Sequence, residues 1–372
     1  VLYTASAQSY TFNHGPYLQE LSEHAVTFVF TTSDKGFSWV EVKPDGGEAE
    51  RHYTVRNGLR DAYNTFNVIR VENLRPDTRY QYRLCSKQIA DFQPYKVTFG
   101  DSIVSPWRRF STPDPKATAC SFIALSDMHQ QPDKLGRLLN QAGVGSADMI
   151  FYVGDMMNYY DNEETPFRSF IDKSVELFAS EKPFVLVRGN HETRGNMARE
   201  YARYVPKSSG KYYGAYRVGD IMFIVLDCGE DKPDDFWVYA GLTDFDGYRT
   251  EQAAWFGELI RSKAYKSAKW RIVMNHFPPL SHMESDNPER HGIQDITDKF
   301  LPLYNQAKID LMISGHTHAY EFMSPDKYDR LTFPVIVNST ESVARIDIDG
   351  RTLKAKVTDT GGNTLKEFTI SK

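Results

Sequence analysis

The sequence has 372 residues and a formal net charge of −5, with 41% hydrophobic and 25% charged residues. At about 150 residues per domain, this length predicts two or three domains, and the ordinary composition excludes a disordered or fibrous protein. No long basic run is present, which argues against a nucleic acid as partner. No stretch of 18 apolar residues occurs either, so no membrane span is predicted.

The three cysteines, Cys85, Cys120 and Cys228, are too few for a disulfide framework, and their spacing fits no zinc motif. Near the start of the chain, Ala5-Ser6-Ala7 has the small-x-small pattern of a signal-peptidase site. The segment is equally typical of an ordinary chain terminus. Both interpretations stay open.

The N-terminal part of the sequence predicts an all-β sandwich. Short segments rich in β-branched and aromatic residues are separated by turn residues. The expected strands cover residues 25–31, 37–42, 67–71 and 80–84. The segment 74–82 resembles the corner of a fibronectin type III sandwich, in which a tyrosine at the start of a late strand packs over the preceding turn. A last strand at 110–112 runs into a proline-rich linker, which predicts one domain over 1–115 and a second over 116–372.

After residue 115 buried strands alternate with helical patterns, which predicts an α/β layered domain whose sheets are covered on both faces. The expected strands are 121–126, 149–153, 183–187, 221–226, 270–274 and 309–313. The expected helices are 135–142, 167–178, 251–260 and 296–307. The tail from residue 335 onwards returns to short strands and is expected to close the second sheet of this domain.

Five polar clusters follow strands of this second domain. Ligand sites of open α/β sheets lie beyond the carboxyl ends of the strands, so these clusters are expected to converge. They are Asp127-Met128-His129, Gly154-Asp155, Gly189-Asn190-His191-Glu192, Asn275-His276 and Gly315-His316-Thr317-His318. Carboxylate, imidazole and amide ligands suit Mn, Fe or Zn better than Ca.

Local geometry gives two further expectations for these clusters. In an extended segment, residues two apart point to the same side, so Asp127 is expected to point with His129, and His316 with His318. Gly154, Gly189 and Gly315 are expected to let the backbone turn sharply beside the site.

The five motifs, in this order over residues 120–320, resemble the calcineurin-like metallophosphoesterase superfamily. The preceding β-sandwich resembles the arrangement found in purple acid phosphatases. The resemblance implies an αββα sandwich for the second domain and a centre with two metal ions. The implied ligands are Asp127, His129 and His318 for the first ion, Asn190, His276 and His316 for the second, and Asp155 as a bridge between them.

The resemblance also implies the chemistry. Two cations about 3.5–4 Å apart hold a shared hydroxide, which attacks the phosphorus in line. His191 matches the family's histidine that protonates or stabilises the leaving oxygen. Purple acid phosphatases have a tyrosine ligand three residues after the bridging aspartate, and this position is Asn158 here. The replacement argues against a ferric acid phosphatase, so the identity of the metals (Mn, Fe or Zn) stays open.

Other polar residues have competing interpretations. Glu192 either orients His191, adds negative charge beside the site or forms an exposed ion pair. His282 and His291 are expected to be surface histidines, with substrate phosphate contacts as the alternative. The segment 230–239 is expected to be a solvated loop pinned by its aromatic residues, with a pocket wall or a cover for a nucleoside base as the alternative.

The expected function is therefore a binuclear phosphoesterase acting on a small-molecule phosphate ester, with a phosphomonoesterase as the first choice. A phosphodiesterase or nucleotidase of the same superfamily is the alternative. A non-catalytic binding or adhesion protein that uses the β-sandwich is a further one. By analogy with the family, an extracytoplasmic location, periplasmic or secreted, is expected.

Overall fold

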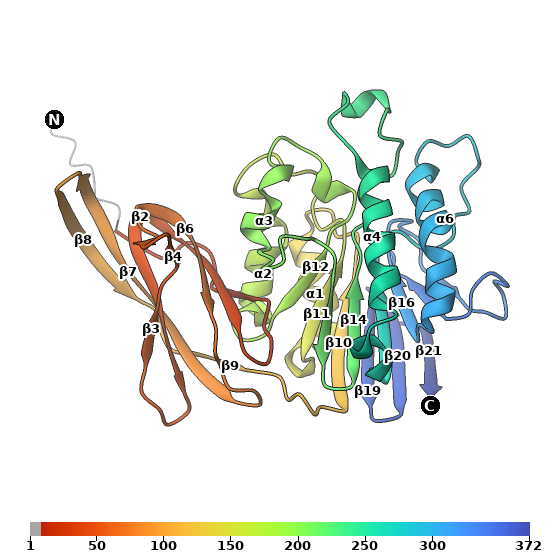
Figure 1. The fold of residues 1–372 in the computed structure, drawn as a ribbon, viewed down its shortest axis with the longest axis horizontal. Coiled ribbons are helices and arrows are strands. Elements are labelled where there is room, and N and C mark those ends of the chain that lie inside the picture. Colours follow the sequence, from red (N-terminus) through yellow and green to blue (C-terminus); the bar gives the residue numbers. More distant parts are fainter. Residues whose placement is uncertain (1–8) are drawn as a thin grey trace. The chain divides into compact units, whose positions relative to one another are not determined.

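The computed structural model of the protein describes residues 9–372, so the Ala5-Ser6-Ala7 segment lies outside the described residues (Figure 1). The chain divides into two compact units. One comprises the residues up to Pro113 together with Phe178–Pro183, and the other comprises Asp114–Leu177 and Phe184–Lys372. Within the described part of the chain, no helix is both long and apolar enough to cross a bilayer.

The first unit is built from antiparallel strands around one very long strand. The strands are β1 (Tyr17–Gln19), β2 (Val26–Pro44), β3 (Glu50–His52), β4 (Val55–Arg56), β5 (Leu59–Arg60), β6 (Asn64–Val71), β7 (Arg79–Gln93), β8 (Lys96–Val104) and β9 (Arg108–Ser111). The sequence predicted two separate strands, 25–31 and 37–42, in the region where the structure has the single strand β2. Its pairing is irregular between Thr31 and Gly36, where it passes from β6 to β7 as partner.

Both halves of β2 contribute to a single core. Val26, Phe28 and Phe30 from the first half are buried in the same cluster as Val40 and Val42 from the second half. Strands that pair with different halves of β2 therefore face one another across this core, as in a β-sandwich.

The tyrosine corner expected near residue 80 is present. The backbone N–H of Arg75 donates to the hydroxyl of Tyr80 at 2.8 Å. The ring of Tyr80 stacks on Phe110, with the centroids 5.3 Å apart and the planes 12° from parallel. The tyrosine thus ties the turn before β7 to the last strand of the unit.

The second unit contains two six-stranded sheets. The first has the order β12-β11-β10-β19-β20-β21, and the second has the order β13-β14-β15-β16-β18-β17. The strands are β10 (Ala119–Leu125), β11 (Met149–Val153), β12 (Phe184–Val187), β13 (Gly214–Val218), β14 (Ile221–Val225), β15 (Trp270–Met274), β16 (Leu311–Ser314), β17 (Glu321–Met323), β18 (Val335–Val337), β19 (Ser342–Asp349), β20 (Thr352–Asp359) and β21 (Thr364–Ser371).

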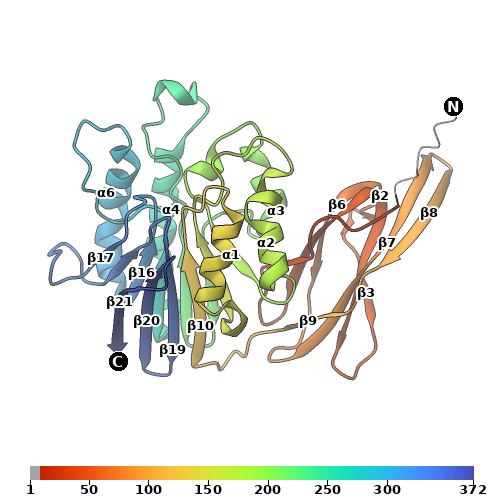
Figure 2. The ribbon, with the colours of Figure 1, turned by 180° about the vertical axis from the view of Figure 1, so that it is seen from behind.

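Alternate residues of the central strands bury both faces of each sheet. On β14, Phe223 lies in the core between the two sheets, whereas Ile224 lies in the core that the second sheet shares with α4 and α6. The helices α4 (Phe245–Leu259) and α6 (Arg290–Ala307) lie in front in Figure 1, and α1 (Pro132–Gln141) lies in front in the reverse view of Figure 2. The expected αββα layering is therefore present. The remaining α-helices are α2 (Asp172–Ser174), α3 (Tyr201–Tyr204) and α5 (Lys263–Ser267), and π-helical turns at Phe167–Ile171 and Val175–Ala179 extend α2 on both sides.

The prediction for the C-terminal tail was wrong for most of its strands. Only β18 joins the second sheet, whereas β19 pairs with β10 and brings β20 and β21 into the first sheet. Alternation of apolar and polar residues predicts a strand but carries no information about its partner. The tail therefore widens the first sheet on the side away from β11.

Parallel pairing places several strand ends at one edge of the unit. In the first sheet β10, β11 and β12 are mutually parallel, and in the second sheet β14, β15, β16 and β18 are. The loops that follow these strands carry all five polar clusters. This edge is therefore where a site can be assembled from both sheets.

Candidate metal centre

The structure brings together every residue that the sequence analysis assigned to the site. The loops after β10, β11 and β12 of the first sheet supply Asp127, His129, Asp155, Asn190 and His191, and the loops after β15 and β16 of the second sheet supply His276, His316 and His318. The two sheets thus contribute to one cluster.

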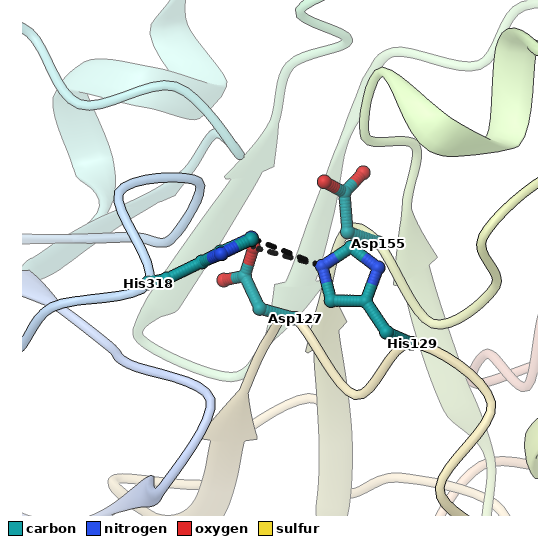
Figure 3. Close-up of side chains that lie close together, drawn as sticks. All are labelled: Asp127, His129, Asp155 and His318. Carbon is teal, nitrogen blue, oxygen red and sulfur yellow. Dashed lines mark hydrogen bonds and ion pairs between the residues drawn. The ribbon is translucent and has the colours of Figure 1, made fainter.

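A first group of metal-ligating atoms comes from Asp127, His129, Asp155 and His318, one atom from each, all within 4.8 Å of one another (Figure 3). Nε2 of His129 lies 3.0 Å from Nε2 of His318. Oδ1 of Asp127 lies 3.5 Å from Nε2 of His318. Two imidazole nitrogens and a carboxylate oxygen that face one point form a donor set typical of a transition metal.

A second group comprises Asp155, His276 and His316, again with ligand atoms within 4.8 Å. Oδ2 of Asp155 lies 3.0 Å from Nε2 of His276. The side chain of Asn190 adjoins this group, with its Oδ1 3.1 Å from Nδ1 of His316. Asp155 belongs to both groups, which is the arrangement expected of a bridging carboxylate.

Nε2 of His316 is buried without a hydrogen-bond partner in the described part of the chain, and Oδ2 of Asp155 and Nε2 of His276 are within hydrogen-bonding distance only of each other, at 3.0 Å. An unsatisfied buried polar atom costs free energy, and a cation at this point would satisfy all three atoms. Nδ1 of His276 donates to the carbonyl of Val153 at 2.7 Å, which directs its other nitrogen into the site. The residues present therefore fit a pair of cations.

Burial and neighbouring charges shift the pKa values of the histidines of the site. Burial lowers the pKa of His276, but the carboxylates of Asp155 and Asp127 outweigh burial and raise the pKa to about 10. Burial lowers the pKa of His129 to about 4 and that of His316 to about 3. These two imidazoles are therefore neutral at pH 7 and able to coordinate a cation, whereas His276 holds a proton that a cation must displace.

The backbone of the site is left-handed where the sequence analysis expected extended segments. Five of the ligand candidates have positive φ: Asp127 (57°), His129 (45°), Asp155 (56°), His316 (73°) and His318 (57°). A non-glycine residue in this region is under strain, and such strain concentrates at functional sites. The side chains therefore converge through tight turns and not through extended segments. Asp127 and His129 share the first group as expected, whereas His316 and His318 belong to different groups.

The three glycines of the motifs serve two purposes. Gly154 has a φ of 88°, so it allows the turn that the sequence analysis expected. Gly189 and Gly315 do not have a positive φ. A Cβ on Gly189 would collide with Asp155, and one on Gly315 would collide with Asp127. These two positions need glycine because the ligand carboxylates approach the backbone closely.

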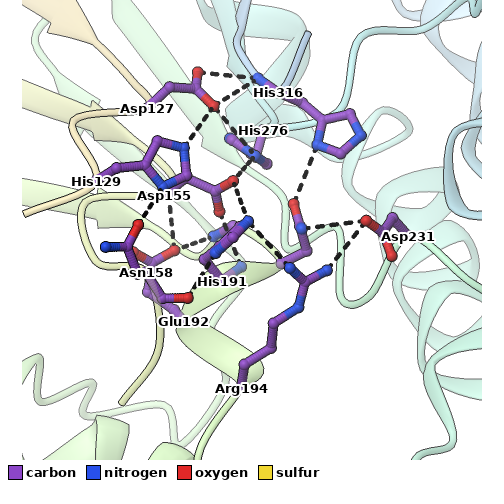
Figure 4. Close-up of polar contacts among 12 residues, drawn as sticks. Asp127, His129, Asp155, Asn158, His191, Glu192, Arg194, Asp231, His276 and His316 are labelled. Carbon is purple, nitrogen blue, oxygen red and sulfur yellow. Dashed lines mark hydrogen bonds and ion pairs between the residues drawn. The ribbon is translucent and has the colours of Figure 1, made fainter. Parts of the chain in front are cut away.

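Asn158 orients two histidines of the site. Its side-chain Oδ1 lies 3.1 Å from Nδ1 of His129, and its backbone carbonyl lies 2.6 Å from Nδ1 of His191 (Figure 4). Because carbonyl and amide oxygens only accept, Nδ1 of each ring carries the hydrogen. Nε2 of His129 is thereby left without a hydrogen and able to bind a cation, so Asn158, at the position of the tyrosine of purple acid phosphatases, orients this ligand candidate.

A sequence model of the calcineurin-like phosphoesterase family matches residues 120–320, which is more than half of the chain. The chain belongs to the calcineurin-like phosphoesterase family. The membership predicted from the motif order is therefore confirmed, and the matched range contains all the ligand candidates described above.

Curated relatives of this phosphoesterase-family chain include plant purple acid phosphatases. It is 25% identical over 206 residues to a probable purple acid phosphatase of Arabidopsis thaliana, covering 51% of this chain and 44% of the relative. It is 23% identical over 264 residues to a purple acid phosphatase of Ipomoea batatas, covering 68% of this chain and 50% of the relative. The chain thus spans about half the length of these relatives.

A solved structure extends the likeness to the fold of nearly the whole chain. A purple acid phosphatase from yellow lupin (Lupinus luteus) seeds superposes with a TM-score of 0.69 and 16% identity, covering 96% of this chain and 74% of that one. At this identity the match shows a shared fold, with a β-rich N-terminal part followed by the α/β unit.

Glu192 is a structural support of the phosphoesterase-family site. Its carboxylate is fully buried and accepts hydrogen bonds from the backbone N–H groups of Asp155 (2.9 Å), Met156 (2.8 Å), Met157 (3.4 Å) and Gly189 (2.8 Å). The expectation of an exposed ion pair was wrong. The carboxylate instead fixes the loop that presents Asp155.

We expect Glu192→Ala to lower the free energy of unfolding by about 3 kcal/mol, because each buried N–H left without a partner costs roughly 1–3 kcal/mol. Metal affinity should fall about 10–100-fold, as is usual when the support of a ligand is lost. Glu192→Gln, which keeps the volume and one acceptor oxygen, should lie between wild type and Glu192→Ala. Thermal unfolding and metal titration measure both effects; unchanged metal affinity in Glu192→Ala would contradict this role.

Arg194 connects His191 with two buried acids that the sequence analysis left in a solvated loop. Its guanidinium lies 2.9 Å from Glu230 and 3.1 Å from Asp231, and Nη1 lies 3.0 Å from Nε2 of His191 (Figure 4). Nδ2 of Asn190 in turn donates to Asp231 at 3.4 Å. Both acids are at most 4% exposed, so the solvated-loop prediction was wrong for them. The position of Arg194, three residues after His191, was the only sequence signal for this network.

His282, in the loop after His276, and His291, in the first turn of α6, contact other groups. Nε2 of His282 lies 3.2 Å from Glu321, and Nε2 of His291 lies 2.9 Å from Asp246. Neither belongs to the groups of ligand atoms described above. The structure therefore supports the surface interpretation for these residues.

Proposed function

We propose that the chain is a metal-dependent phosphomonoesterase that hydrolyses a small-molecule phosphate ester at a centre of two metal ions. The observation that carries the proposal is the pair of ligand groups that share Asp155. The proposed ligands are Asp127, His129, Asp155 and His318 for one ion and Asp155, Asn190, His276 and His316 for the other. Family membership supports hydrolysis of a phosphate ester as the reaction class.

In this proposal the cations supply the chemistry at phosphorus, and the protein residues position the cations. Two cations held by these residues would supply Lewis acidity, which activates water and neutralises the charge of the phosphoryl oxygens. The protein holds the ligands through the buried support of Glu192 and through the hydrogen bond from His276 to Val153. The net charge of −5 does not favour a phosphate ester, so the local positive charge would have to come from the cations.

His191 is the proposed proton donor to the leaving oxygen. Nδ1 carries a hydrogen that it donates to Asn158, and Nε2 accepts from Arg194, since a guanidinium only donates. Protonation of the leaving oxygen therefore requires an additional proton on Nε2. A protonated Nε2 can no longer accept a hydrogen bond, so the guanidinium of Arg194 has to turn away from it. The N–H group of Arg194 that is released in this way could donate to a phosphoryl oxygen of the substrate.

The metal pair is proposed to consist of Mn, Fe or Zn in the divalent state. Asn158 stands at the position of the tyrosine ligand of purple acid phosphatases, and it accepts a hydrogen bond from His129. Without a tyrosinate, the site lacks the hard anionic ligand that favours ferric iron. Imidazole nitrogens predominate among the proposed ligands, which suits these divalent ions.

We also propose the domain limits 1–115 and 116–372, a fibronectin type III-like first domain and an extracytoplasmic location, periplasmic or secreted. The tyrosine corner at Tyr80 supports the likeness of the first domain. Fractionation of the cells that make the protein tests the location, since recovery with the cytoplasmic enzymes would contradict it.

The decisive experiment compares p-nitrophenyl phosphate with bis(p-nitrophenyl) phosphate. The chelated protein is refilled with Mn²⁺, Zn²⁺ or Fe²⁺ and assayed on both esters. The proposal predicts metal-dependent turnover with a higher kcat/KM for the monoester. A preference for the diester would favour the phosphodiesterase alternative. No turnover with any metal would contradict the proposed phosphoesterase activity and favour a binding role for the β-sandwich.

Metal binding is expected to release protons at pH 7, because the raised pKa of His276, about 10, keeps its imidazole protonated in the metal-free site. Below that pKa a cation must displace the proton, so metal affinity should rise as the pH increases from 6 to 8. Calorimetric titration in two buffers of different ionisation enthalpy measures the number of protons released. A binding enthalpy that does not depend on the buffer would contradict this expectation.

A further inference from the structure

A large cavity opens beside the proposed metal centre, within the second unit. It has a volume of about 850 Å³, within the usual range of small-molecule sites and far more than a phosphate group needs. Thr193, Arg194 and Glu230 line its wall next to the centre. His191 does not itself line the cavity, but Arg194, which does, lies 3.0 Å from Nε2 of the proposed proton donor His191.

We propose that this cavity binds the leaving group of the substrate, and that this group carries a planar, uncharged ring. The inference rests on the proposed function, which places the phosphoryl group at the metals and the leaving oxygen at His191. A leaving group next to His191 then extends along Arg194 into the cavity. The substrate class is thereby narrowed to ring-bearing phosphate monoesters, such as nucleoside monophosphates.

The lining of the cavity favours a ring. Four aromatic and two larger aliphatic side chains line it: Tyr212, Tyr239, Phe245, Tyr248, Val238 and Leu242. The hydroxyl of Tyr239 donates to Glu230 at 2.9 Å, and that of Tyr248 donates to Asp227 at 3.3 Å. Because these two hydroxyls are already hydrogen-bonded, the two tyrosines can contact a ligand mainly through the carbon atoms of their rings. Aromatic faces pack well against a planar ring.

The charges of the cavity wall favour an uncharged group. Four of its five cationic side chains have acidic partners: Arg188 pairs with Asp227 (2.8 Å), Lys211 with Glu251 (2.6 Å), Lys232 with Asp231 (2.9 Å) and Arg194 with Glu230 (2.9 Å). Arg199 is the one lining cation without an ion pair in the described part of the chain. Because most of these cationic side chains are already paired with acids, the wall has little free positive charge with which to bind a second phosphate or a polyanion.

Two exposed apolar residues provide the test variants. Leu242 is 69% exposed and lines the cavity, whereas Trp237, on the same loop and 80% exposed, does not. Leu242→Glu places a carboxylate in the cavity at little risk to folding. Trp237→Glu makes the same change of charge outside the lining and is the matched control.

The experiment compares adenosine 5′-monophosphate with ribose 5-phosphate on the metal-loaded protein. Both lose phosphate from a 5′-oxygen of ribose, so the ratio of their kcat/KM values reports mainly contacts to the base. We expect a ratio of about 10 or more for wild type, since base–aromatic stacking contributes this much. Leu242→Glu should lower the ratio to below about 3, whereas Trp237→Glu should keep the wild-type ratio.

The outcomes separate this inference from the proposed function. If p-nitrophenyl phosphate is hydrolysed but the two natural esters react with equal kcat/KM, or neither reacts, the cavity does not bind a ring and the inference fails alone. An unchanged ratio in Leu242→Glu would overturn it as well. If no ester is hydrolysed with any metal, the proposed function fails.

Discussion

Replacing Asp155 by asparagine is expected to release at least one metal ion and to lower kcat by about 10³-fold. The carboxylate belongs to both groups of ligand atoms, and its neighbour His276 depends on it for a counter-charge. An amide has one oxygen and no charge, so it cannot bridge two cations. Losing several kcal/mol of transition-state stabilisation corresponds to a decrease of this size.

Metal analysis and steady-state kinetics on the same samples of Asp155→Asn measure both effects. Asp326→Asn, a change at a solvent-exposed aspartate outside the ligand groups, is the matched control and should retain both ions and the wild-type rate. Retention of two tightly bound ions in Asp155→Asn would contradict the bridging assignment. A loss of ions with unchanged turnover would contradict the role of the metals.

His191→Ala is expected to keep both metals but to slow turnover by roughly 10²–10⁴-fold on esters with a poor leaving group. The imidazole is not among the proposed ligands, and its Nε2 lies 3.8 Å from Oδ2 of Asp155. p-Nitrophenolate leaves without a proton, so the variant should lose much less activity on p-nitrophenyl phosphate than on an alkyl phosphate.

This dependence on the leaving group separates proton donation from a merely structural role. His282→Ala, at an exposed histidine that pairs with Glu321, is the control and should resemble wild type on both esters. If His191→Ala lost the same factor on alkyl and aryl esters, His191 would not be the proton donor. An unchanged rate on both would remove it from the mechanism.

Several features of the fold and the site could be predicted from the sequence because they depend on local patterns. The apolar run at 149–153 and the mostly apolar run at 270–274 coincide with β11 and β15, since a strand buried on both faces is rich in apolar residues. The convergence of Asp127, Asp155 and His316 followed from the rule that parallel strands end at one edge of a sheet.

Features that depend on long-range contacts could not be predicted in this way. Strand β19 has the same alternating pattern whether it joins the first or the second sheet, so only the structure shows that it pairs with β10. The buried role of Glu192 depends on the N–H groups of a loop 35–37 residues earlier. Glu230 was predicted to lie in a solvated loop, because its ion-pair partner Arg194 is distant in sequence.

The most direct test of the two-metal account is a titration of the metal-free protein with Mn²⁺, in which hydrolysis of p-nitrophenyl phosphate is followed as a function of bound ions per chain. The shared Asp155 predicts that activity stays low with one ion and becomes maximal at two. Full activity at one bound ion per chain, or no dependence on the metal, would contradict the account.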